Sequence, residues 1–66
     1  MGVFSERLRE VRREKGLCQS ELAEKLNVKQ ATVGSWEKGK TEPSFDLVYR
    51  IMEVLGVDAN YLFGLS

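Results

Sequence analysis

Few side chains in this 66-residue sequence could carry out chemistry. There is one cysteine, Cys18, and there is no histidine, so this chain can form neither an internal disulfide nor a zinc site of the usual cysteine and histidine kind. We also find no evident pair of buried carboxylates, no glycine loop that could cradle a phosphate, and no nucleophile with a matching base. We therefore expect no cofactor, no metal and no enzymatic activity, and nothing points to a small-molecule ligand.

The remaining polar chemistry lies between residues 29 and 40, where small polar side chains are mixed with lysines. Val33 and Trp36 are three residues apart, so in a short helix they share one apolar face that would be buried. Gln30 and Ser35 lie on other faces of the same helix. A helix with a small polar face can enter the major groove of DNA while a neighbouring helix crosses the backbone. These residues therefore indicate a nucleic-acid-binding surface.

Charge along the chain is polarised, although the formal net charge is zero. Residues 1–41 carry nine Lys or Arg against six Glu, a net of +3, while residues 42–66 carry one Arg against four acidic residues, a net of −3. Basic patches favour nucleic acid, and the alternative is that the charges simply scatter over the surface, as they do on any small domain. The asymmetry supports DNA binding without proving it.

The elements that must position these residues are helices, because the apolar residues recur at helical spacing and glycine, asparagine or proline ends each run. Phe4, Leu8 and Val11 predict a helix over residues 4–15, and a second is expected over 19–26 with Asn27 in the left-handed conformation. A third begins near Gln30. After an extended connection at residues 41–43, Ser44 caps a fourth helix and Asp58 caps a short fifth.

Several short motifs lie at fixed spacing along the chain: Gln19, then Glu21-Leu22-Ala23, then Val33-x-x-Trp36-Glu37-x-Gly39-Lys40, and then Pro43-Ser44. Together they resemble the Cro and lambda-repressor-like helix-turn-helix family, and the resemblance covers essentially the whole chain. The resemblance implies an all-α, compact five-helix bundle in residues 1–66, with the helix-turn-helix at about 19–38. It implies a DNA-binding transcriptional regulator of bacterial or phage type, acting as a repressor and as a homodimer on double-stranded DNA.

The resemblance also implies roles for individual residues. Base-reading positions are Gln30, Ala31, Gly34 and Ser35. Phosphate-contacting or flanking positions are Gln19, Lys29, Thr32, Lys38 and Lys40. Arg12 and Glu37 match a structural ion pair that joins the first helix to the end of the third. Simple solvation is the alternative for Gln30 and the two later lysines.

Some positions depart from the family pattern. Cys18 and Lys29 stand at helix starts where a hydroxyl residue is usual, so we expect weak capping there. Gly34 costs about 1 kcal/mol relative to alanine inside a helix. It either permits close approach to DNA or simply weakens the helix. A redox role for Cys18 is a further alternative that depends on an electropositive surrounding.

Two questions stay open at this stage. Tyr61, Phe63 and Leu65 offer apolar surface for a dimer, or they close the core of a monomer. The whole chain could instead be a protein-interaction module, such as an antitoxin or accessory factor, whose acidic last third binds a basic partner. No stretch approaches the roughly 20 apolar residues of a membrane span and no signal peptide is evident, so we expect a cytoplasmic protein. The operator and any effector are not determined by the sequence.

Overall fold

The computed structural model describes residues 3–65, which form five helices and, within that range, no strand. The helices are α1 (Val3–Glu14), α2 (Gln19–Leu26), α3 (Gln30–Glu37), α4 (Phe45–Leu55) and α5 (Ala59–Phe63). This confirms the predicted all-α five-helix bundle. The second and third helices begin where expected, and α1 begins and ends one residue earlier than predicted. None of these helices combines the length and the apolar character needed to cross a bilayer.

Local interactions account for the helix ends. Asn27 adopts the left-handed conformation with φ of 61°, as predicted, and its backbone N–H is donated back to α2. The Ser44 hydroxyl accepts a hydrogen bond from the Leu47 N–H at 3.3 Å, and the Asp58 carboxylate accepts one from the Tyr61 N–H at 2.9 Å. Both residues are therefore the N-caps that the sequence predicts.

The start of α2 is better anchored than the thiol of Cys18 suggests. The Glu21 carboxylate reaches back and accepts a hydrogen bond from the Cys18 backbone N–H at 2.8 Å. This is the glutamate half of a capping box. The hydrogen bond stabilises the ionised carboxylate and lowers the pKa of Glu21 below its ordinary value. Glu21 thus supplies an anchor at the start of α2 that the prediction of weak capping by Cys18 did not include.

A single apolar core unites the helices. Its buried members are Leu8, Val11, Leu22, Ala23, Leu26, Val33, Trp36, Ile51, Leu55 and Leu62. Trp36 is only 3% exposed, so it belongs to the core and is not a platform for stacking on bases. Because Val33 and Trp36 both face inward, the opposite side of α3 is left at the surface.

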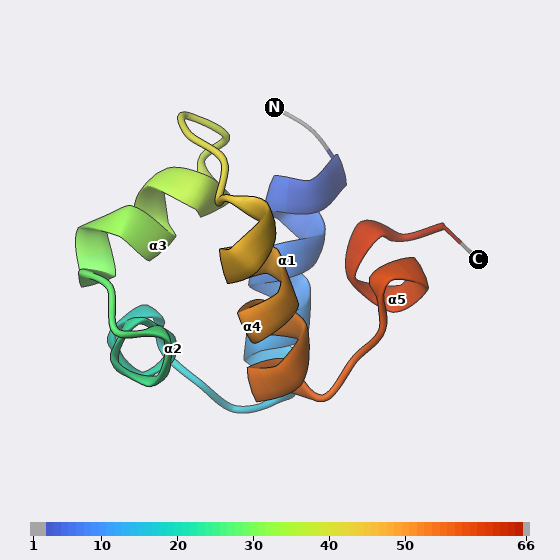
Figure 1. Ribbon diagram of the computed structural model, residues 1–66, viewed down its shortest axis with the longest axis horizontal. Coiled ribbons are helices and arrows are strands. Elements are labelled where there is room, and N and C mark those ends of the chain that lie inside the picture. Colours follow the sequence, from blue (N-terminus) through green and yellow to red (C-terminus); the bar gives the residue numbers. More distant parts are fainter. Residues whose placement is uncertain (1–2, 66) are drawn as a thin grey trace.

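Figure 1 shows α2 and α3 together on one side of α1 and α4, with α5 on the other side. α5 packs on α1, and Arg7 links the two by donating hydrogen bonds to the Tyr61 carbonyl at 2.7 and 3.2 Å. The rings of Phe4 and Phe63 add an aromatic contact, with centroids 5.2 Å apart. The pair α2 and α3 therefore presents its outer surface away from α5.

Candidate nucleic-acid interface

A shallow concavity of about 380 Å³ lies between α2 and α3. Its lining consists of residues that the sequence had already singled out: Gln19, Gln30, Ala31, Gly34, Ser35, Lys38 and Lys40. Lys29 and Thr32 do not line it: Lys29 is exposed at the N-cap of α3, and Thr32 is half-buried on the same helix. Residues from positions 19 to 40 thus meet on one surface because the two helices pack against each other.

Hydrogen bonds join the two glutamines of this surface. Gln30 Nε2 donates to Gln19 Oε1 at 2.6 Å, and Gln19 Nε2 donates to Glu37 Oε1 at 3.0 Å. A carboxylate can only accept, so the amide nitrogen of Gln19 must face Glu37 and its oxygen must face Gln30. This orientation leaves Gln30 Oε1 and the second hydrogen of its Nε2 directed to other partners.

Glu37 is itself held by the buried side chain of Arg12. Arg12 Nε donates to Glu37 Oε2 at 2.7 Å, and Arg12 Nη2 donates to Glu37 Oε1 at 3.0 Å. Arg12 Nη1 donates to the Leu17 carbonyl at 2.8 Å. Arg12 is 7% exposed and Glu37 is 5% exposed, and the bidentate contact raises the pKa of the Arg12 guanidinium. The carboxylate is therefore the fixed point on which Gln19, and through it Gln30, is oriented.

Ser35 also has a partner that sequence reasoning missed. The Thr41 hydroxyl donates a hydrogen bond to Ser35 Oγ at 3.0 Å. Thr41 lies in the connection between α3 and α4, and no spacing rule would have selected it. The contact ties this connection to the helix that lines the concavity.

Gly34 is buried, and its missing side chain faces α2. A Cβ at this position would come 3.4 Å from Gln19 Oε1, at ordinary van der Waals distance from the end of a flexible side chain. The room at Gly34 is therefore occupied by Gln19.

We expect Gly34→Ala to raise the free energy of unfolding by about 0.5–1 kcal/mol, because alanine loses less backbone entropy in a helix and Gln19 can yield by the small amount required. Thermal unfolding of the wild type and the variant measures this change in stability. Gly39→Ala is the matched control and should destabilise, because φ at Gly39 is 75°. A lower melting temperature for Gly34→Ala would show that Gln19 cannot move.

The apolar residues near the end of the chain differ in their surroundings. Phe63 is half-buried against Phe4. Tyr61 is 45% exposed, with its hydroxyl donating to Glu14 at 2.7 Å, and Leu65 is 67% exposed. Sequence reasoning missed Phe45, which is 86% exposed at the start of α4. Its position in the first turn of α4, three residues before Val48 on the same side of the helix, was the available signal.

Comparison with known proteins agrees with this geometry. A family model described as helix-turn-helix matches residues 8–62. The chain belongs to this helix-turn-helix family. It is 42% identical over 57 residues to a helix-turn-helix transcriptional regulator of Archaeoglobus fulgidus, covering 86% of this chain and 81% of that protein. A prophage-derived regulator of Bacillus subtilis is 33% identical over 60 residues, which cover 91% of this chain and 56% of that protein.

Among solved structures, the restriction-modification controller protein C.AhdI from Aeromonas hydrophila is similar to this helix-turn-helix domain, with a TM-score of 0.84 and 32% identity over 91% of each chain. The family and these relatives support a DNA-binding transcriptional regulator. In this helix-turn-helix domain, α2 and α3 are the two helices of the motif, so the concavity between them is the candidate DNA-binding surface.

Proposed function

We propose that this regulator reads a short operator by inserting α3 into the major groove, with Gln30 as the principal base-reading residue. The observation that carries the proposal is the hydrogen-bond chain from Glu37 through Gln19 to Gln30. It leaves one acceptor and one donor on the Gln30 amide, and adenine presents the complementary N6 donor and N7 acceptor in the major groove. Gln30 is thus oriented for adenine before DNA arrives.

The neighbouring residues complete the proposed reading surface. Ala31 is exposed next to Gln30 and can contact a thymine methyl group, while the Ser35 hydroxyl can bond either kind of base edge. Gly34 forms part of the floor and keeps α3 close to Gln19. Lys29 and Thr32 flank the surface at the start of α3.

Backbone phosphates are the proposed partners of the remaining polar groups. The Gln19 side chain already contacts Glu37 and Gln30, so its backbone N–H at the start of α2 is the better phosphate donor. Lys38 and Lys40 are exposed, line the concavity and follow directly on α3. Contacts of this kind set affinity and register without reading sequence.

We expect Lys38→Ala and Lys40→Ala each to reduce the slope of log affinity against log salt by about 0.9, because each phosphate contact releases counterions. Fluorescence anisotropy with a labelled duplex over a salt series measures the slope. Lys15→Ala removes the same charge at an exposed position that does not line the concavity, and it should leave the slope unchanged. If both test variants have the wild-type slope, neither lysine contacts a DNA phosphate.

We further propose that the regulator binds as a homodimer and represses transcription by occupying its operator. Tyr61 and Leu65 expose apolar surface at the end of the chain, and Phe63 supports them from its place against Phe4. A symmetric dimer places two recognition helices about one helical turn apart on the duplex.

Selection from a pool of randomised duplexes at near-physiological salt tests the proposed function. We expect enrichment of a near-palindrome with half-sites roughly 10 base pairs apart and an adenine at a fixed position in each. A reporter placed behind the selected site should show reduced expression. An unenriched pool would overturn direct operator reading by this chain and would favour an interaction module that binds a protein partner.

A further inference from the structure

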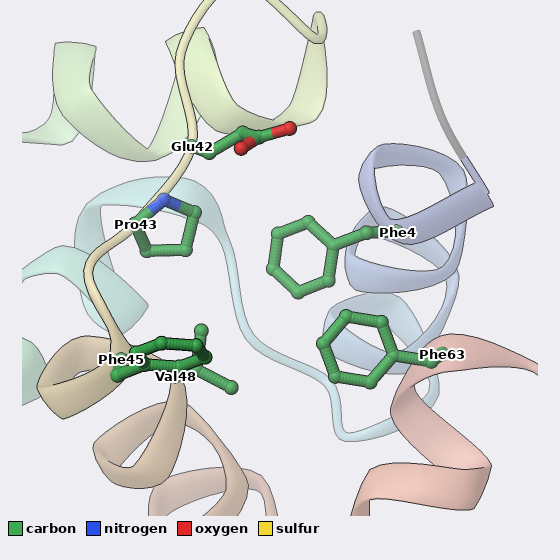
Figure 2. A pocket seen from close by; sticks show the side chains of 6 residues that line it. All are labelled: Phe4, Glu42, Pro43, Phe45, Val48 and Phe63. Atoms are coloured by element: carbon green, nitrogen blue, oxygen red, sulfur yellow. The ribbon is translucent and has the colours of Figure 1, made fainter.

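A second concavity, of about 220 Å³, lies where the connection before α4 passes α1 and α5. Its lining consists of Phe4, Glu42, Pro43, Phe45, Val48 and Phe63 (Figure 2). These include all three phenylalanines and the only proline of the chain. The concavity shares no lining residue with the candidate DNA-binding surface, so it is a separate site.

Aromatic rings form both walls of this pocket. Phe4 and Phe63 contact each other with an interplanar angle of 33°, and they stand opposite Phe45 and Val48 (Figure 2). Phe45 is 86% exposed, so almost all of its ring is open to a ligand. The faces of aromatic rings carry negative electrostatic potential and attract cations.

The charged group that lines this pocket is negative, like the potential at the faces of the aromatic rings. Glu42 is the only charged residue in the lining, and its carboxylate makes no ion pair or hydrogen bond among residues 3–65. Arg7, on the helix that supplies Phe4, is held by Glu10 at 2.9 Å and by the Tyr61 carbonyl. Asp46 follows Phe45 in the first turn of α4 and adds a second acidic residue next to this wall of the pocket.

We propose that this pocket binds a small organic ammonium ion that carries an apolar group. The apolar group would lie between the phenylalanine rings, and the ammonium would face Glu42 and the ring faces. The volume is below the roughly 300 Å³ of sites for drug-sized ligands, which selects a ligand with one ring or a short alkyl chain. The Glu42 carboxylate repels anions. Neutral polar molecules should bind weakly, because apart from Glu42 the lining side chains are apolar.

Three probes of similar size separate the contribution of the positive charge from that of the apolar ring: 2-phenylethylammonium, 2-phenylethanol and phenylacetate. Titration of the isotope-labelled protein followed by NMR measures binding without DNA, so the result is independent of the proposed operator reading. We expect amide shifts at Phe4, Glu42 and Phe45, with the ammonium binding about threefold to tenfold more tightly than the alcohol and the carboxylate binding most weakly.

Matched variants sharpen this test. Glu42→Gln should remove the advantage of the ammonium over the alcohol, while Phe45→Ala should weaken both. Glu53→Gln, an exposed change elsewhere on α4, should leave every affinity unchanged. Equal affinity for ammonium and alcohol in the wild type would overturn the proposal, as would shifts confined to other residues or no shifts at all. Concentration-dependent shifts at Glu42 and Phe45 without any probe would also overturn it, because a second copy would then occupy the pocket.

Discussion

Glu37→Ala should lower the free energy of unfolding by about 3–5 kcal/mol, because it leaves the buried Arg12 guanidinium without its partner. Both side chains of the pair are less than one-tenth exposed, and three donor atoms converge on the carboxylate: Arg12 Nε, Arg12 Nη2 and Gln19 Nε2. Domains have a total stability of about 5–15 kcal/mol, so the loss is a large part of it. The melting temperature should fall by at least about 10 °C.

Thermal and urea unfolding followed by circular dichroism measure this loss. Glu53→Ala is the matched control, since it removes an exposed glutamate from α4 and should change stability by less than about 0.5 kcal/mol. A double variant that replaces Arg12 and Glu37 together with apolar residues should recover much of the stability, because neither charge is then left buried alone. If Glu37→Ala melts at the wild-type temperature, the pair does not support the fold.

Gln30→Ala should abolish the preference for adenine at one operator position in each half-site, a loss of about 1–3 kcal/mol of discrimination. The wild-type amide has its orientation fixed by Gln19, and alanine offers neither the donor nor the acceptor that adenine requires. The side chain is exposed, so the substitution should leave the fold intact. Affinities for the selected operator and for its single-base variants measure the effect.

Lys38→Ala is the control for this measurement. It should weaken binding to every operator variant by a similar factor, because a phosphate contact does not distinguish bases. Gln30→Ala should instead reduce binding to the preferred site while leaving the variants at that one position almost equal. An unchanged ranking of the four bases in the Gln30 variant would show that another residue reads this position.

Both predictions involve Glu37, which we propose stabilises the fold and orients the Gln30 amide through Gln19. Its Oε1 accepts hydrogen bonds from both Arg12 and Gln19. The expected effects are separable, because Gln30→Ala changes base preference in a stable protein, whereas Glu37→Ala reduces the folded population. One carboxylate thus connects the buried Arg12 to the Gln19 side chain at the surface.

Much of the fold could be predicted because its signals are local. Ser44 and Asp58 cap helices through backbone groups three residues away, and Asn27 ends α2 through its own backbone conformation. The spacing of Val33 and Trp36 places both on the buried face of α3, which also determines which side of that helix stays exposed. Interactions of this range depend on the order of residues alone.

The tertiary structure decided how distant residues combine. Gln19 and Gln30 are eleven positions apart, and only the packing of α2 on α3 brings their amides together and places Gly34 beneath them. Phe4, Phe45 and Phe63 come from three helices, and no periodicity within one helix relates them. The sequence by itself thus determined the helices, their ends and the family motif. The orientation of the Gln30 amide and the aromatic pocket required the packed structure, because each depends on contacts between helices.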